Sequence, residues 1–233
     1  MNEQFKKKLS QQYDVFFVDI KIDKKTGLVE GKNKRFATMP YIGKKYQEAK
    51  KKILFVGTDI GEDEYARTNR FQSFEEREEN VFSSNNPHIA GTYVTALYFL
   101  KEIYNWGNYY EQINKNWTCQ KARKSLRNLP TEVLEYISLT NYYKFVTVDR
   151  ENERSGGKDR VFNSIIFEKK IFQDEIMLLN PDIIIFQSVK FANLDLIPEI
   201  INMGIEVYVA PHPSNRAKNG RVPNEYISQI IKK

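Results

Sequence analysis

The chain has 233 residues, of which 41% are hydrophobic and 28% are charged, and its net charge is +6. This length fits one sizeable domain or two small ones, and the composition is ordinary for a globular protein. No apolar run reaches the roughly 20 residues of a membrane-spanning helix, and residues 1–14 lack the apolar core of a signal peptide. We therefore expect a cytoplasmic protein without a membrane partner. Cys119 is the only cysteine, which excludes an intrachain disulfide and any site built from several thiolates.

The basic excess is concentrated in the first fifth of the chain. Residues 1–52 contain 14 Lys or Arg and 6 Asp or Glu, whereas residues 53–233 contain 22 and 24. A basic segment of this kind suits a polyanion, and nucleic acid is the commonest one. A solvated lysine-rich surface explains the same charges, so both interpretations stay open.

The basic segment is expected to form a few short elements. Residues 2–13 predict a short basic helix, and 15–21 (VFFVDIK) predict a strand. Glycines amid charge at 24–35 indicate a loop or hairpin, and residues 39–43 indicate a turn. No linker separates this segment from the rest. We therefore expect one domain over 1–233, with residues 1–52 as a basic N-terminal elaboration.

Four short apolar runs follow, at 53–56, 136–140, 183–186 and 207–209. Such uninterrupted runs are typical of strands buried on both faces. Helical patterns lie between them, at 91–104, 163–179 and 196–203, whereas 105–116 is expected to be a loop. The alternation predicts a three-layer α/β/α sandwich with a central, mostly parallel four-stranded sheet.

Polar residues follow three of these four strands. Thr58 and Asp59 come after the first, Asn141 after the second, and His212, between two prolines, after the fourth. Because ligand sites form beyond the carboxyl ends of parallel strands, we expect these side chains to converge. The Gly57–Gly61 segment lacks both the third glycine of a dinucleotide fingerprint and the Gly-Lys-Ser/Thr of a phosphate loop. Acids follow at 62–64, and a helix N-terminus explains them better than a metal site does.

The order of these motifs resembles the uracil-DNA glycosylase superfamily over roughly residues 50–220. The resemblance lies in Gly57-Thr58-Asp59, Phe82-Ser83, Leu139-Thr140-Asn141, the Asn180–Ile185 segment and His212-Pro213-Ser214. It implies a DNA glycosylase that acts as a monomer on DNA, in repair or phage defence, without metal or organic cofactor.

The resemblance also implies roles for individual residues. Asp59 falls where the family places its water-activating carboxylate, and His212 where a histidine stabilises the departing base. Phe82 matches the aromatic that stacks on the flipped base, and Asn141 matches the asparagine that reads its edge, with Thr58 beside them. The loop after His212 would contact DNA through four residues: Ser214, Asn215, Arg216 and Lys218.

The chain departs from the family pattern directly after Asp59. The tyrosine that blocks bulk at the pyrimidine 5-position in the best-known members has no counterpart here, where Ile60 and Gly61 stand. A loose pocket rejects an extra methyl group poorly. The expected substrate is therefore uracil or a 5-modified pyrimidine, including a hypermodified phage cytosine, with the larger 5-substituents preferred to plain uracil. The loop at 105–116 would close the pocket if it folded over it.

Three other functions fit the same residues. One is a non-catalytic nucleic-acid-binding protein on the same fold. A second is a metal-dependent hydrolase that uses Asp59 and the acids at 62–64. A third is an α/β enzyme for a small molecule, which the basic segment disfavours.

Overall fold

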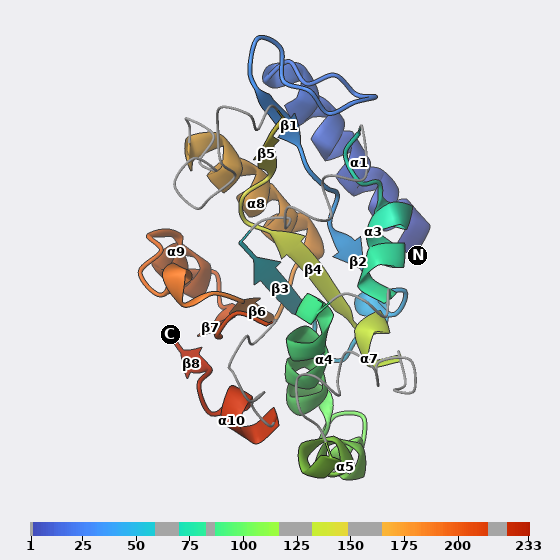
Figure 1. Ribbon diagram of the computed structural model, residues 1–233, viewed down its shortest axis with the longest axis vertical. Helices are drawn as coiled ribbons and strands as arrows, with labels where there is room; N and C mark the ends of the chain where they lie inside the picture. Colours follow the sequence, from blue (N-terminus) through green and yellow to red (C-terminus); the bar gives the residue numbers. More distant parts are fainter. Residues whose placement is uncertain (1, 59–69, 83–86, 117–131, 149–164, 214–222) are drawn as a thin grey trace.

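The computed structural model describes residues 2–58, 70–82, 87–116, 132–148, 165–213 and 223–233. Figure 1 shows its helices and strands. The first half contains α1 (Asn2–Asp19), β1 (Lys34–Phe36), β2 (Tyr41–Ile42), a 3₁₀ turn (Tyr46–Glu48), β3 (Ile53–Gly57), α3 (Phe74–Phe82), α4 (Pro87–Leu100) and α5 (Gly107–Asn116). The second half contains α7 (Glu132–Glu135), β4 (Ile137–Asn141), β5 (Phe145–Thr147), α8 (Ile165–Leu179), β6 (Ile183–Phe186), a 3₁₀ turn (Val189–Phe191), α9 (Leu196–Asn202), β7 (Glu206–Val209), α10 (Pro223–Ile227) and β8 (Ile231–Lys232).

The main sheet has six strands in the order β2-β4-β3-β6-β7-β8, and a separate two-stranded sheet pairs β1 with β5. The four inner strands β4, β3, β6 and β7 are mutually parallel, whereas β2 and β8 pair antiparallel at the two edges. The α/β class is confirmed, but the sheet is mixed and six-stranded instead of four-stranded. Both edge strands have two residues, which is too short for a recognisable period in the sequence.

Two separate apolar cores lie against the main sheet. Alternate residues of β3 and β6 point to opposite faces, as a strand requires. Leu54, Val56, Ile184 and Phe186 pack with α1, α8 and α9. Ile53, Phe55, Ile183 and Ile185 pack with α4, α5 and α7. Helices therefore cover both faces of the sheet.

The expected strand at 15–21 is wrong, because α1 continues to Asp19. Leu9, Tyr13, Phe16 and Phe17 repeat with helical spacing and are buried in the core shared with α8. Val15 is exposed on the opposite side. Burial of one helical face therefore prevails over the β-propensity of the Val-Phe-Phe-Val run.

Two further expectations need correction. Residues 107–116, expected to be a loop, form α5, which buries Tyr110 and Ile113. The helix expected over 91–104 begins earlier, at Pro87, and ends at Leu100. Proline suits the first turn of a helix because the amide it lacks would have no partner there. None of the helices that the structure describes is long and apolar enough to span a membrane.

Candidate functional site

The four parallel strands end at the same level of the sheet. Gly57 at the end of β3 is in register with Asn141 at the end of β4, and Phe186 at the end of β6 is in register with Val56 and Val209. The chain runs from β3 to β4 on one side and then crosses to β6 on the other side of β3. In open α/β sheets, such a reversal of strand order creates a crevice beyond the carboxyl ends. The candidate site is therefore centred on the ends of β3 and β6.

Asn141 is held rigidly at this edge. Its side chain is only 5% exposed, and Arg77 donates a hydrogen bond from Nη2 to Asn141 Oδ1 at 3.1 Å. A Cβ atom placed on Gly57 would lie 2.9 Å from Asn141 Nδ2. The glycine thus leaves the room that the amide occupies. The amide carbonyl faces Arg77 of α3, and the amide nitrogen lies against the end of β3.

Helix α3 forms one wall beside Asn141. Arg77 and Val81, one turn apart, are its buried residues. Phe82 at its C-terminal end is half-buried, and its ring meets that of Tyr41 edge-to-face at 5.9 Å. Tyr41 in turn donates to the carbonyl of Leu134 at 3.0 Å. The structure thus places Phe82 in the wall that α3 forms with β2.

Thr58 continues the backbone pairing between β3 and β4 beyond the ends of both strands. Its carbonyl accepts from the backbone N–H of Tyr143 at 2.9 Å, and the carbonyl of Gly57 accepts from Tyr142 at 2.9 Å. The Thr58 side chain is half-buried. These bonds fix the backbone directly after Asn141.

The segment that carries His212 is anchored on either side of this residue. Tyr226 donates from its hydroxyl to the carbonyl of Pro211 at 2.8 Å. A Cβ atom on Gly91 would lie 2.5 Å from the carbonyl oxygen of Pro213, so the backbone of Pro213 lies directly against α4. His212 itself is exposed. The backbone on either side of His212 is therefore fixed, at Pro211 by α10 and at Pro213 by α4.

Sequence reasoning missed two residues of the edge. Gln187 directly follows β6, at the edge where Asn141 ends β4; it is buried, and its Nε2 donates to Thr92 of α4 at 2.6 Å. The same pattern of a polar residue after an apolar strand would have found it. Arg77 lies in a polar run of α3, and nothing in that run distinguishes it from its neighbours.

The structure brings Thr58 and Asn141 to one edge, with His212 after β7 at the same end of the sheet. Five other predicted site residues lie outside the described residues, and their roles remain predictions: Asp59, Ser214, Asn215, Arg216 and Lys218. The acids at 62–64 also lie outside them. Among the residues that the structure describes, no group of three or more His, Cys, Asp or Glu is arranged to hold a metal ion.

A second polar cluster lies under the sheet face that α1 and α8 cover. Lys144 and Glu175 are each 1% exposed, and Lys144 Nζ lies 2.7 Å from both carboxylate oxygens of Glu175. Thr140 donates to the same carboxylate at 2.9 Å, and Tyr13 donates from its hydroxyl. Burial lowers the pKa of Lys144, and burial beside Glu175 raises the pKa of Tyr13.

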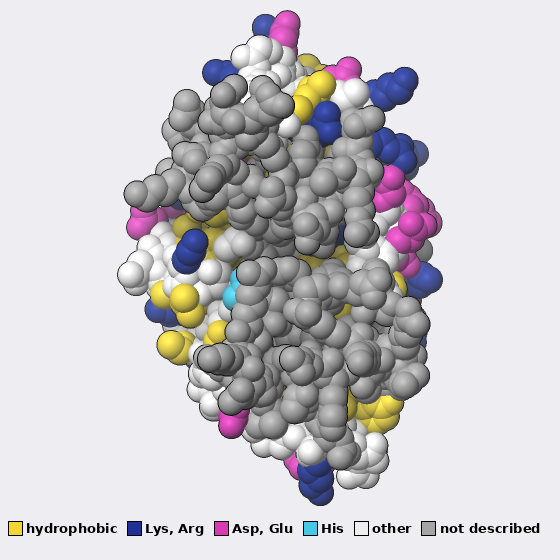
Figure 2. Space-filling view, viewed as in Figure 1, with side chains coloured by type: hydrophobic (Ala, Val, Ile, Leu, Met, Phe, Trp, Pro, Cys, Tyr) yellow, Lys and Arg dark blue, Asp and Glu magenta, His cyan; other side chains and the backbone are white. Residues whose placement is uncertain are grey.

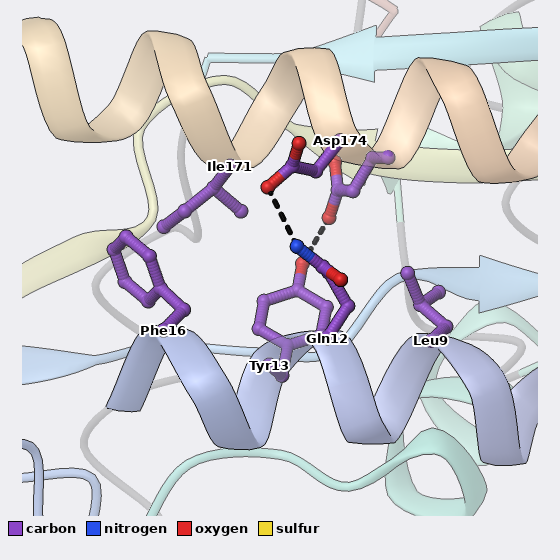
Figure 3. Close-up of a pocket in the computed structure, with 7 residues that line it drawn as sticks. Leu9, Gln12, Tyr13, Phe16, Ile171 and Asp174 are labelled. Carbon is purple, nitrogen blue, oxygen red and sulfur yellow. Dashed lines mark hydrogen bonds between the residues drawn. The ribbon is translucent and has the colours of Figure 1, made fainter. Parts of the chain in front are cut away.

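A small cavity adjoins this cluster between α1 and α8. Figure 3 shows Gln12 of α1 directed toward Asp174 of α8, to which Gln12 Nε2 donates at 3.0 Å. The cavity measures about 10 Å³, which is room for about one water molecule. It cannot hold a nucleobase, so the carboxyl edge of the sheet remains the candidate site.

No protein-family model matches the chain, and a search of curated proteins finds no match either.

Proposed function

We propose that the protein is a DNA glycosylase that hydrolyses the N-glycosidic bond of a flipped-out pyrimidine and leaves an abasic site. The observation that carries the proposal is the fixed and buried position of the Asn141 amide. This buried amide is fixed by Arg77 at the carboxyl end of β4, beside the glycine that ends β3. A fixed amide at a topological switch point suits the recognition of one edge of a planar heterocycle.

The proposed reaction divides the work between the two sides of the scissile bond. Asp59 orients a water molecule toward C1′ and stabilises the positive charge that develops on the sugar. The electron pair of the C1′–N bond leaves with the base, and His212 stabilises that charge by donating a hydrogen bond. The anchoring of Pro211 by Tyr226 and of Pro213 by α4 supports this role, because it fixes the backbone on either side of His212. The products are a free base and an abasic sugar.

Binding requires the base to leave the DNA stack, which costs a few kcal/mol. Phe82 would offset part of this cost by stacking, and Thr58 and Asn141 would hold the base at the strand ends. We propose that the chain acts as a monomer on a three-layer fold of the uracil-DNA glycosylase type. The residues after Asp59 favour a 5-substituted pyrimidine as substrate, and a role in repair or phage defence follows from that class.

Single-turnover base release tests the proposal. Oligonucleotides that contain uracil, 5-hydroxymethyluracil or glucosylated hydroxymethylcytosine are incubated with excess protein, and abasic sites are scored. We expect release from at least one of them, and we expect His212→Ala to slow it by about 100-fold, the typical loss for one electrostatic donor. Asp59→Asn should slow it at least as much. The matched control is Lys233→Ala, because Lys233 is exposed and its backbone N–H donates to Val207 near the start of β7, at the opposite end of the sheet.

The outcomes separate this proposal from its alternatives. Binding without release from any substrate would leave a non-catalytic nucleic-acid-binding protein. Release that a chelator abolishes would indicate a metal-dependent hydrolase instead. A preference for plain uracil would keep the glycosylase and reject the open pocket at the 5-position.

A further inference from the structure

We propose that Tyr226 is a positioning residue for His212. Its hydroxyl holds the peptide unit that leads into His212 and so sets the direction in which the imidazole leaves the backbone at the carboxyl edge of the sheet. The effect on the backbone holds for any ligand, whereas the effect on base release rests on the proposed function.

The main sheet stops holding the chain just before His212. Ala210 follows β7 directly, and its backbone N–H donates to the carbonyl of Phe186 at 2.8 Å. Pro211 has no N–H with which to continue this pairing. Its carbonyl instead accepts from the Tyr226 hydroxyl at 2.8 Å. Tyr226 is only 3% exposed, so the packing of its ring directs the hydroxyl to this carbonyl.

This hydrogen bond acts on His212 through the geometry of the peptide group. The carbonyl of Pro211 and the N–H of His212 belong to one planar unit, so fixing the carbonyl also fixes the N–H. Pro213 restricts the backbone of His212 itself to the extended region. The backbone of Pro213 lies against α4, since a Cβ atom on Gly91 would be 2.5 Å from its carbonyl oxygen. The direction of the Cα–Cβ bond of His212 follows from these restraints.

Helix α10 holds Tyr226 in turn, because the helix is attached to its surroundings at both ends. At its start, Asn224 accepts at Oδ1 from the Tyr110 hydroxyl at 2.7 Å, and its N–H donates to Asn114 Oδ1 at 3.0 Å. Both partners belong to α5. After the end of α10, β8 pairs antiparallel with β7. The donor to Pro211 is therefore itself fixed relative to the sheet.

The imidazole remains accessible while its backbone is held. His212 is exposed, and β7, which precedes it, ends in register with β6. A hydrogen-bond donor that is already oriented needs no rearrangement when charge develops on a departing base. Loss of the Tyr226 hydroxyl should therefore reduce the rate of base release and leave the affinity for DNA unchanged.

The two histidines of the chain allow a direct test of the backbone. Protein labelled with ¹⁵N only at histidine gives two backbone amide signals, and the His88→Gln variant assigns them. Order parameters from ¹⁵N relaxation are measured for the wild type, Tyr226→Phe and Tyr110→Phe. Tyr110→Phe is the matched control, because it removes one buried hydroxyl from the contact between α5 and α10 and leaves the bond to Pro211 in place.

We expect the order parameter of the His212 amide to be about 0.85 in the wild type and in Tyr110→Phe, the value of a rigid backbone. In Tyr226→Phe it should fall below about 0.6, the flexible range. Thermal unfolding of all three proteins reports any general loss of stability. A merely structural role of Tyr226 would lower the unfolding temperature and leave the His212 amide rigid, and that result would overturn the inference.

A double-mutant cycle tests the consequence for base release. The release rate is measured in single turnovers for the wild type, Tyr226→Phe, His212→Ala and the double variant. If Tyr226 acts through His212, Tyr226→Phe should slow release by about tenfold in the wild-type background and cause no further loss after His212→Ala. Dissociation constants for the same DNA should not change. Equal losses in both backgrounds would show that Tyr226 acts by another route, and would overturn the inference.

The positioning role and the proposed function fail in different ways. An ordered His212 amide that depends on the Tyr226 hydroxyl, without base release from any substrate, would support the positioning role and reject the glycosylase. Base release by the wild type, with the His212 amide and the release rate unchanged in Tyr226→Phe, would do the reverse.

Discussion

Glu168 is a buried acid close to Lys144, and it gives the protein a stability that depends on pH. Its side chain is fully buried; Oε1 accepts from the backbone N–H of Lys144 at 3.2 Å, and Oε2 has no hydrogen-bond partner among the described residues. Burial raises the pKa of Glu168 to about 8, although Lys144 and Lys34 oppose the shift. The carboxyl group is therefore protonated in the folded protein at neutral pH.

This pKa predicts that stability falls as pH rises from about 5 to 8. In that window the unfolded chain has lost the proton and the folded chain keeps it, so unfolding is favoured by up to about 1.4 kcal/mol for each pH unit. Glu168→Gln removes the titration while keeping the shape. We expect the variant to match the wild type below pH 4.5 and to become progressively more stable up to pH 8, as measured by urea denaturation.

The control for this experiment is Glu199→Gln. Glu199 lies on α9, its side chain is 49% exposed, and it pairs with Lys169 at 2.6 Å. A surface pair of this kind contributes at most about 1 kcal/mol. Parallel stability curves for the wild type and Glu168→Gln across the whole pH range would show that Glu168 is ionised in the folded protein.

At the scale of elements, the contact between α4 and the segment after β7 positions His212. Gly91→Ala would put a methyl group 2.5 Å from the carbonyl oxygen of Pro213 and 2.8 Å from its Cα, so the backbone must move. We expect this substitution to cost about 1–3 kcal/mol of stability, as overpacking does. If His212 stabilises the departing base as proposed, the substitution should also slow base release at least tenfold, because small displacements of a catalytic group are costly.

Gly107→Ala is the matched control for that prediction. Gly107 begins α5, and a Cβ atom there would meet nothing within 4 Å. The measurements are thermal unfolding and single-turnover release. Unchanged release in Gly91→Ala, together with unchanged stability, would mean that this contact does not position His212.

The elements predictable from sequence are those whose apolar pattern stands alone. The runs at 53–56 and 183–186 match β3 and β6 because a central parallel strand is apolar at every position. Edge strands β2 and β8 derive their pairing from neighbours distant in the chain, which no local pattern records. The same distinction between local and distant signals applies to the residues of the candidate site. Asn141 was predictable from its place after a strand, whereas Arg77 reaches it across 64 residues.

At the scale of the whole molecule, residues 1–52 contribute to both the core and the surface. Tyr13 and Phe17 of α1 pack with Phe36 in the same core as β3 and β6. Several lysines of this segment pair with acids elsewhere in the chain: Lys6 and Lys44 with Glu78, Lys45 with Glu132 and Glu135, and Lys51 with Glu206. Figure 2 shows basic and acidic side chains side by side along the edge where Figure 1 places α1 and α3. Part of the basic excess is therefore neutralised within the molecule.

The remaining charge of this segment extends toward the candidate site. Strand β1 pairs with β5, which begins four residues after β4 ends, and Lys34 Nζ donates to Thr147 at 2.8 Å. In Figure 1 the arrows of β3 and β4 point toward this pair of strands. Strand β1 thus lies on the side of the sheet where the strands end, whereas Lys51 pairs with Glu206 at the start of β7, at the opposite end. Under the proposed function, DNA would approach the side that carries β1.

This arrangement predicts which lysines contact phosphate. Lys7, Lys8, Lys25 and Lys32 are exposed, so replacing all four with Gln should weaken binding to duplex DNA of any sequence. Each lost phosphate contact reduces the magnitude of the slope of log K against log salt concentration by about 0.9, so the loss of four contacts would reduce it by about 3.6. The matched control replaces four exposed lysines outside the segment, Lys115, Lys170, Lys190 and Lys233. The slopes are measured by fluorescence anisotropy between roughly 50 and 200 mM salt. Equal slopes for the two variants would identify residues 1–52 as a solvated surface. A lower slope for the first variant alone would show that residues 1–52 contact the DNA backbone, because a charge that contacts no phosphate releases no counterions.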